Sequence, residues 1–175
     1  MTENKNSVKK TVFLFVVAFL CLFAMTAGIV VNHSMQADAK TLTGEPIRWQ
    51  SENWKVVNFF APWCAPCLRE IPALNRLYRS LENDVQVIGV SYDGGSQQAL
   101  QQLVNDLNVE FDVLNTSDDF TLPMAFPGYL PATYLISPSG EVAQTLYGEQ
   151  TETALRERLN HLRQEVEGAH SADEH

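Results

Sequence analysis

Apolar and polar positions divide the chain into an N-terminal apolar run and a longer part with mixed periodicity. Residues 11–31 contain no charged side chain, and an apolar run of about 20 residues is long enough to cross a bilayer as a helix. Three lysines precede the run, whereas the next basic residue after it is Lys40. Because lysine and arginine concentrate on the cytoplasmic side of a membrane, we predict a cytoplasmic segment at 1–10 and a transmembrane anchor at 11–31.

A cleaved secretory signal is the alternative interpretation of the same segment. Its cleavage site would be the small-residue sequence Ala-Asp-Ala at residues 37–39. Secretory signals ordinarily have an apolar core of only about 7–15 residues, so the longer run favours an uncleaved anchor. Under either interpretation the remaining domain is exported. We therefore expect a single-pass inner-membrane protein whose folded domain lies in the periplasm or another extracytoplasmic space.

Beyond the anchor, strand-like and helix-like periods alternate. Apolar residues recur at spacings of three and four from Leu68 to Leu81, which is typical of a helix, and Pro72 should kink that helix because it lacks a backbone donor. Apolar runs rich in β-branched and aromatic residues indicate strands.

We expect the following segments in chain order: a linker at 32–44, strands at 46–50, 54–60 and 85–92, a helix capped by Ser96, a strand at 111–114, a loop at 115–131, a hairpin of 132–136 and 141–147, a helix at 151–164, and a polar, frayed tail at 165–175. Alternating strands and helices followed by a hairpin predict an α/β domain at residues 45–164. Its fold should be three-layered, with a central mixed sheet and helices on both faces.

The charge distribution restricts the partners of this domain. Residues 32–175 contain nine lysines and arginines but twenty aspartates and glutamates. Nucleic acids and anionic membrane surfaces attract basic patches, so we expect no nucleic-acid partner.

Cys64 and Cys67 have the spacing of a redox dithiol, of half a zinc site, or of a structural disulfide. A structural zinc ion needs four ligands, but Cys21 lies in the apolar run and the four histidines lie near the ends of the chain. A structural disulfide across so short a loop would constrain the unfolded chain little. The redox dithiol is therefore favoured, and we expect neither a metal nor another cofactor.

The position of the pair between a strand and a helix predicts a role for each cysteine. Free N–H groups and the helix dipole at a helix start favour a thiolate at Cys64, and the thiolate is the nucleophile in disulfide exchange. Cys67 follows one helical turn later and can attack a mixed disulfide formed at Cys64. Pro66 suits the first helical turn. We predict that Cys64 attacks and Cys67 resolves.

Two segments resemble a known family. Residues 59–72, Phe-Phe-Ala-Pro-Trp-Cys-Ala-Pro-Cys-Leu-Arg-Glu-Ile-Pro, resemble the active-site segment of thioredoxin-fold proteins, and specifically the membrane-anchored TlpA/ResA-like group, which includes the cytochrome c maturation thioredoxins. Residues 130–136, Leu-Pro-Ala-Thr-Tyr-Leu-Ile, resemble the cis-proline segment of that family. The fold expectation becomes a thioredoxin-like one.

This resemblance implies the remaining parts of a thiol–disulfide oxidoreductase. It implies a redox-active disulfide between Cys64 and Cys67, a cis peptide bond before Pro131, and a substrate groove lined by Leu130 and flanked by Trp63. Its substrates would be disulfides in exported proteins, with apocytochrome c as one candidate. The anchor further implies an integral-membrane electron donor, and we expect a monomer.

Two positions depart from better-known patterns within the fold. Asn58 occupies the position at which thioredoxin has a buried acid that accepts the proton of the resolving thiol; the TlpA/ResA-like group often has asparagine there. Ala65 stands where some of those reductases have glutamate. No general base is therefore evident from the sequence. Three carboxylates are candidates, although each is ordinarily a solvated surface charge: Glu70, Asp118 and Asp119.

The residues between the cysteines also bear on the direction of electron flow. Ala65 and Pro66 carry no charge, and Arg69 is the only nearby cation, so we predict a reductant. The alternatives are a disulfide oxidase or isomerase, with an oxidising potential, and a non-enzymatic copper-handling module. Copper-handling proteins of this fold use a longer cysteine spacing and a downstream histidine, and this chain has neither in its core. Peroxidases use a Thr-x-x-Cys setting, which Cys64 lacks.

Three further apolar features have simpler interpretations. Trp49 and Trp54 are expected to pack in the core or at its edge. Residues 120–129 are unusually apolar for a loop. They form either a partner-binding rim beside Pro131 or a short helix on the core.

Overall fold

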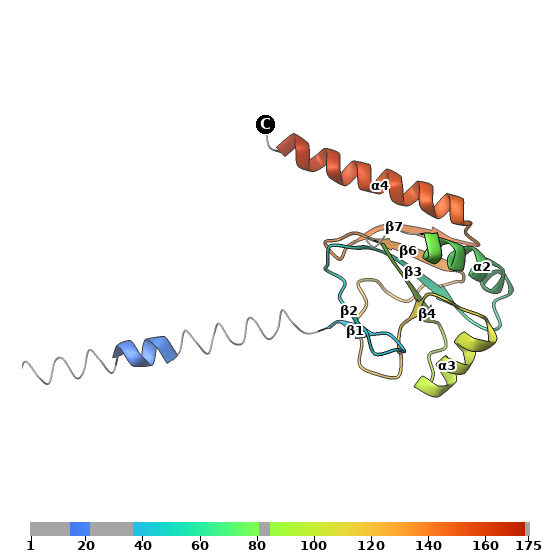
Figure 1. Ribbon diagram of the computed structural model, residues 1–175, viewed down its shortest axis with the longest axis horizontal. Helices are drawn as coiled ribbons and strands as arrows, with labels where there is room; N and C mark the ends of the chain where they lie inside the picture. Colours follow the sequence, from blue (N-terminus) through green and yellow to red (C-terminus); the bar gives the residue numbers. More distant parts are fainter. Residues whose placement is uncertain (1–14, 22–36, 81–84, 174–175) are drawn as a thin grey trace, which may run out of the picture. The chain divides into compact units, whose positions relative to one another are not determined.

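The computed structural model describes residues 15–21, 37–80 and 85–173, and the chain divides into two compact units at residues 1–36 and 37–175 (Figure 1). Residues 15–21 form a helix with exposed side chains. Within the described residues, no helix is both long and apolar enough to cross a membrane. Most of the predicted anchor at 11–31 lies outside them, so the anchor stays a prediction.

The second unit is built on a five-stranded sheet with the order β5-β4-β3-β6-β7. Strands β3, β4 and β5 are parallel, whereas β6 is antiparallel to β3 and β7 is antiparallel to β6, so the predicted mixed sheet is confirmed. The bounds are Trp54–Phe60 for β3, Val85–Ser91 for β4, Asp112–Val113 for β5, Ala132–Ile136 for β6 and Val142–Tyr147 for β7. These bounds lie within two residues of the predicted ones.

Strand β3 is the middle strand of the sheet, and every one of its seven residues is buried. Such a strand carries apolar residues on both faces, since each face is covered by another layer. Side chains alternate between the two faces along a strand. Asn58 therefore points to one face, beside Thr133 of β6, and Phe59 points to the other.

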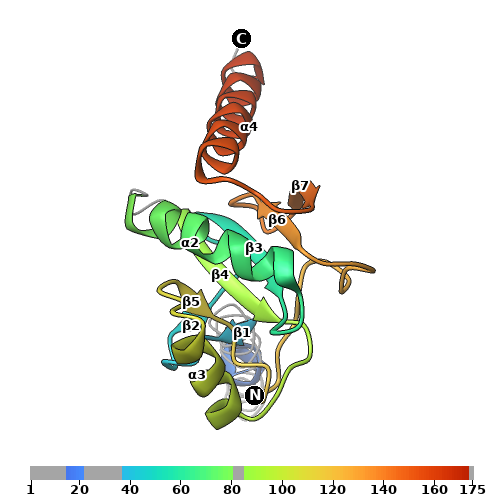
Figure 2. The ribbon, with the colours of Figure 1, turned by 90° about the vertical axis from the view of Figure 1, so that its right-hand side faces the viewer.

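Three helices pack against the same face of the sheet (Figure 2). They are α2 (Ala65–Ser80), which contains Pro72, α3 (Gln97–Asp106), which is capped by the Ser96 side chain as predicted, and α4 (Glu152–Asp173). One apolar cluster joins Leu74 of α2, Leu100 of α3 and Leu155 of α4. The prediction of helices on both faces is therefore wrong for the described residues. Both parallel crossovers step in the same direction across the sheet, and right-handed connections then place α2 and α3 on one side.

The opposite face is covered by irregular chain and a small hairpin. Strands β1 (Ala39–Lys40) and β2 (Pro46–Ile47) pair antiparallel, and Trp49 Nε1 donates to the Thr121 carbonyl oxygen at 2.8 Å. Residues 120–129 form no helix, so the short-helix alternative is wrong; Phe120, Leu122 and Met124 pack against the core as irregular chain, and the partner-binding rim stays a prediction. Residues 37–44 are part of the domain rather than a linker, and the domain begins before residue 45. The reason is that Ala39 and Leu42 supply buried apolar surface.

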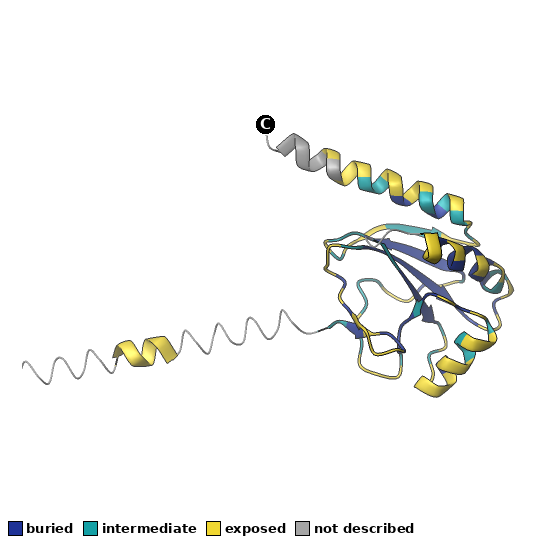
Figure 3. Ribbon diagram, viewed as in Figure 1, coloured by how far each residue is buried: buried dark blue, intermediate teal, exposed yellow. Residues whose placement is uncertain are grey.

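Helix α4 extends beyond the predicted helix end and includes most of the segment expected to fray. No proline interrupts residues 164–173, and His161 pairs with Glu165 one turn later at 3.4 Å, so nothing in the sequence ends the helix at residue 164. Among the α4 residues whose burial is described, the buried ones, Leu155 and Leu159, lie in the first part of the helix, nearest the sheet (Figure 3).

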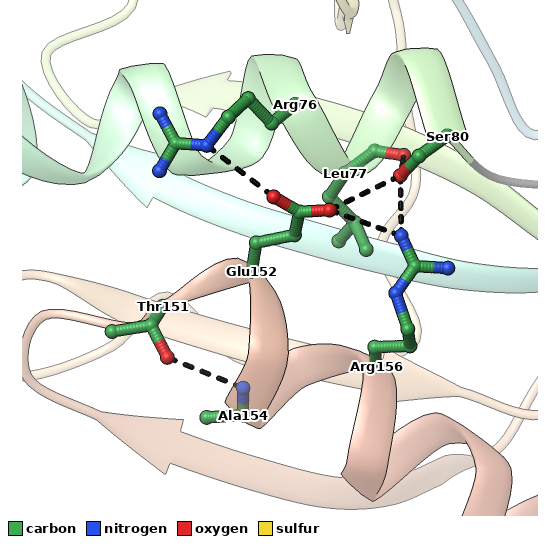
Figure 4. A network of polar contacts seen from close by, with 7 residues as sticks. All are labelled: Arg76, Leu77, Ser80, Thr151, Glu152, Ala154 and Arg156. Atoms are coloured by element: carbon green, nitrogen blue, oxygen red, sulfur yellow. Dashed lines mark hydrogen bonds and ion pairs between the residues drawn. The ribbon is translucent and has the colours of Figure 1, made fainter.

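The start of α4 is held against α2 by a group of charged side chains (Figure 4). Glu152 accepts from Arg76 of α2 at 3.3 Å and from Arg156 of α4 at 3.1 Å, and Thr151 caps the helix by accepting from the Ala154 N–H. The hydrogen bond from Arg156, followed by that from Arg76, lowers the pKa of Glu152. These contacts fix the chain segment that precedes α4, and that segment extends to the candidate active site.

Candidate active site

The Cys64–Cys67 pair forms a disulfide at the N-terminus of α2. Strand β3 ends at Phe60, and the helix begins at Ala65, so Cys64 occupies the residue before the first turn and Pro66 lies within that turn, as predicted. The Cys67 N–H donates to Cys64 Sγ at 3.3 Å. A free helix N–H directed at this sulfur stabilises the thiolate form of Cys64 when the disulfide opens.

The two sulfur-bearing residues differ in accessibility. Cys64 keeps 5% of its surface exposed and Cys67 keeps none. Phe60 and Ala61 form a cluster with them, and Leu130 packs against it. Cys64 is thus the more accessible of the two cysteines, and the order of attack stays a prediction.

The peptide bond between Leu130 and Pro131 is cis, as the family resemblance implied. The Pro131 carbonyl oxygen accepts from the Gly148 N–H at 2.9 Å, which ties this segment to the turn after β7. Because Leu130 packs against the cluster that contains both cysteines, the structure brings the cis-proline segment to the dithiol.

A buried polar site lies on the α2 side of β3, and we call it the polar site. It consists of Asn58, Thr133, Glu70 and the Gln150 N–H. Asn58 Nδ2 donates to Glu70 Oε1 at 2.7 Å and to Thr133 Oγ1 at 3.0 Å, and the Gln150 N–H donates to Glu70 Oε2 at 3.0 Å. Both amide hydrogens of Asn58 are engaged, so its orientation is fixed.

Glu70 is the carboxylate that sequence reasoning undervalued. Its side chain is buried, with 1% exposed, and burial raises its pKa to about 7. Hydrogen bonds from Gln150 and Asn58 oppose this rise, and the nearby charge of Glu149 adds to it. Asp118 and Asp119 are exposed. The helical period could have indicated that Glu70 is buried, because position 70 shares the inward face of α2 with Cys67, Ile71 and Leu74.

On the other side of β3, Trp63 begins a series of aromatic contacts. The Trp63 ring is 64% exposed, and its Nε1 donates to Asp93 Oδ2 at 2.8 Å. It packs edge-to-face on Tyr92, which in turn contacts Phe126. Asp93 and these rings carry no motif, so the sequence did not reveal their contact with Trp63. Trp49 and Trp54 are buried in the core, as expected.

Comparison with known proteins decides the family. Residues 32–145 match the AhpC/TSA family. The chain belongs to the AhpC/TSA family.

Curated relatives of this AhpC/TSA protein include the thiol-disulfide oxidoreductase ResA of Oceanobacillus iheyensis, which is 31% identical over 108 residues that cover 61% of this chain and 56% of that protein. ResA of Bacillus thuringiensis is 28% identical over 171 residues, covering 88% of this chain and 98% of that protein. A solved structure of DsbF from MTB is similar with a TM-score of 0.53 and 27% identity, covering 73% of this chain and 96% of the other.

These similarities confirm the resemblance inferred from the cysteine segment. The AhpC/TSA protein has the thioredoxin-like fold and is a thiol–disulfide oxidoreductase. Among the described residues, no group of three or more His, Cys, Asp or Glu side chains is arranged to hold a metal ion.

Proposed function

We propose that this oxidoreductase reduces disulfides in exported proteins, with Cys64 as the attacking thiol and Cys67 as the resolving thiol. The observation that carries the proposal is the disulfide at the start of α2, in which the more exposed cysteine also receives a helix N–H at its sulfur. Trp63 and the Leu130–Pro131 segment border it and would contact the substrate backbone.

The reaction transfers two electrons and balances as two exchanges. The Cys64 thiolate attacks one sulfur of the substrate disulfide, and the other substrate sulfur leaves as a thiolate that takes a proton. Cys67 then loses its proton and attacks Cys64 Sγ, which releases the second substrate thiol and forms the Cys64–Cys67 disulfide. The substrate disulfide is reduced and the dithiol is oxidised.

Glu70 is the group suited to accept the proton of Cys67. It lies one helical turn after Cys67 on the same buried side of α2, and its raised pKa of about 7 is close to that needed to take up and return a proton near neutral pH. Asn58, which holds Glu70 through its amide, replaces the acid that other thioredoxins have on this strand.

A reducing direction follows from the weak stabilisation of the Cys64 thiolate. Ala65 and Pro66 are uncharged, and the Arg69 guanidinium pairs with Glu149 at 2.8 Å. A strongly stabilised thiolate makes a dithiol oxidising. Without a dedicated cation at Cys64, the disulfide form is favoured and the reduced form donates electrons readily.

The predicted anchor places this chemistry on the outer side of the inner membrane. There the protein would act as a monomer, apocytochrome c would be one candidate substrate, and an integral-membrane donor would re-reduce Cys64–Cys67. The lysines before residue 11 and the charge-free run at 11–31 support this topology.

Trapping tests the proposed roles. A Cys67→Ser variant of the full-length chain should accumulate mixed disulfides through Cys64 with exported proteins, whereas Cys64→Ser should accumulate none. Mass spectrometry of the adducts would name the substrates. Absence of any Cys64-dependent adduct would contradict the assignment of the nucleophile.

Equilibration with glutathione tests the direction. The ratio of dithiol to disulfide, measured by alkylation and mass shift, should correspond to a potential close to that of thioredoxin, about −270 mV. A potential of about −120 mV, typical of strong oxidants, would identify an oxidase instead.

A further inference from the structure

Seven aromatic side chains form an arc that begins on one side of the dithiol and ends at the cis-proline segment. We call it the aromatic arc; its members, in order of contact, are Trp63, Tyr92, Phe126, Phe59, Tyr134, Tyr147 and Tyr129. Neighbouring ring centroids in the first part lie 5.2–6.4 Å apart at steep angles. These separations and angles are those of favourable edge-to-face packing.

The middle of the arc is rigid because it belongs to the core. Phe59 is fully buried in β3, and Tyr134 is buried in β6 within the same apolar cluster. Burial, and then the nearby Tyr147, raise the pKa of Tyr134. Tyr147 pairs with Ala132 on β6, two residues from Tyr134, so its backbone is held beside this core.

The two ends of the arc are exposed, as is Phe126, which lies between Tyr92 and the buried Phe59. Trp63 is 64% exposed at one end; at the other, Tyr129 is 63% exposed and Tyr147 is 49% exposed, with their ring centroids 4.6 Å apart. Large aromatic side chains held in fixed positions at the surface are typical of recognition sites, because they bury much area on binding and lose little entropy.

The tyrosine pair is continuous with the substrate-binding segment. Tyr129 precedes Leu130 and the cis Pro131, and Tyr147 pairs with Ala132 across β6 and β7. An extended chain advances about 3.3 Å per residue. Tyr129 lies two residues before Pro131, so a substrate strand that paired with this segment with its cysteine opposite Pro131 would place a side chain about two residues from the cysteine opposite Tyr129.

We propose that Tyr129 and Tyr147 form a recognition subsite for a large apolar side chain about two residues from the reactive cysteine of an extended substrate segment. This inference rests on the proposed function, since it needs a polypeptide disulfide as substrate. It narrows the substrate class to unfolded or flexible segments with leucine, phenylalanine or a similar residue near the cysteine.

Matched peptides test the subsite. Short peptides with one cysteine, joined by a disulfide to glutathione, would carry leucine or serine two residues before or after the cysteine. The pre-reduced full-length chain donates two electrons, releasing peptide thiol and glutathione and forming the Cys64–Cys67 disulfide. The measured quantity is the ratio of second-order rate constants for the leucine and serine peptides.

Wild-type protein should prefer a leucine peptide, and Tyr129→Ser should lower the leucine-to-serine ratio about tenfold, the effect of losing one well-packed aromatic contact. Tyr147→Phe keeps the ring and should change the ratio less than Tyr147→Ser. Tyr78→Ser removes another exposed tyrosine, near the far end of α2, and should leave the ratio unchanged. A general folding defect slows both peptides and cancels in the ratio.

The outcomes separate the two proposals. Reduction of both peptides at equal rates, or a ratio unaffected by Tyr129→Ser, overturns the subsite and leaves the reductase function standing. Failure of the reduced wild-type chain to reduce either peptide contradicts the reductase function itself.

Discussion

The two faces of β3 next to the dithiol differ in polarity and in exposure. On the α2 face, Asn58 begins the polar site, which is sealed from solvent around Glu70. On the opposite face, its neighbour Phe59 begins the buried middle of the aromatic arc, whose two ends are exposed. One residue of strand separates the two regions, because side chains alternate across a sheet.

This difference separates two tasks of one redox site. A buried carboxylate with a raised pKa can exchange a proton but cannot touch a large substrate. Exposed rings with buried supports can touch a substrate but exchange no proton near neutral pH. Substitutions on the α2 face should therefore alter proton exchange, and substitutions on the opposite face should alter contact with the substrate. A substitution that altered both properties equally would contradict this division.

The largest loss of stability is expected at the centre of the aromatic arc. Phe59→Ala removes a fully buried ring that packs on Phe126 and Tyr134, and such truncations cost about 3–5 kcal/mol. Urea unfolding of the full-length chain would measure the change. The pH dependence contributed by Glu70 should remain.

Phe59→Leu is the matched control for this prediction. It keeps an apolar side chain at the position, and the free energy of unfolding should fall by less than about 1.5 kcal/mol if the surrounding rings repack. A loss below about 1 kcal/mol for Phe59→Ala would show that the arc has no rigid middle.

A substitution in the polar site should give the next largest change in the free energy of unfolding, and this change should depend on pH. The raised pKa of Glu70, about 7 against an ordinary 4.5, means that the folded protein binds this proton more tightly than the unfolded chain. Its stabilising contribution is complete below about pH 4.5 and is lost as the pH rises through 7. The loss amounts to roughly 3 kcal/mol at most.

Glu70→Gln removes this titration and tests it. Between pH 5 and 8, the free energy of unfolding of the oxidised wild-type chain should fall relative to that of the variant, as measured by urea unfolding at each pH. Alkylation of Cys67 in the reduced chain should also lose its pH dependence near 7. Parallel pH profiles for wild type and Glu70→Gln would show that Glu70 does not titrate in this range.

Much of the fold and the two cysteines could be predicted from the sequence, because each depended on local patterns. The run at 54–60 is mostly apolar, and the cysteine spacing lies between a strand and a helix, so β3 and the start of α2 followed directly. The side of the sheet on which α3 packs depends on the direction of successive crossovers, which the order of elements along the chain does not give.

The unpredicted parts of the site depend on contacts between distant segments. Glu70 is held by a main-chain N–H of Gln150, eighty residues later, and Tyr129 meets Tyr147 only because β6 and β7 pair. A carboxylate on a helix and a tyrosine in a loop are ordinary surface residues by composition. The helical period alone could have placed Glu70 on the buried face of α2.

The smallest predicted effect concerns the exposed end of the aromatic arc at Trp63. The Asp93 carboxylate accepts from Trp63 Nε1 at 2.8 Å in an exposed position, and a single exposed hydrogen bond of this kind contributes about 0.5–1.5 kcal/mol. Asp93→Ala should therefore cost the fold no more than about 1.5 kcal/mol, but it should loosen the indole ring. Acrylamide quenching would detect this, since Trp49 and Trp54 are buried and Trp63 is the accessible indole of the three. Asp93→Asn keeps a neutral acceptor and should fall between wild type and Asp93→Ala. Identical quenching in all three proteins would mean that the contact with Tyr92 alone holds Trp63, and that this end of the arc needs no polar support.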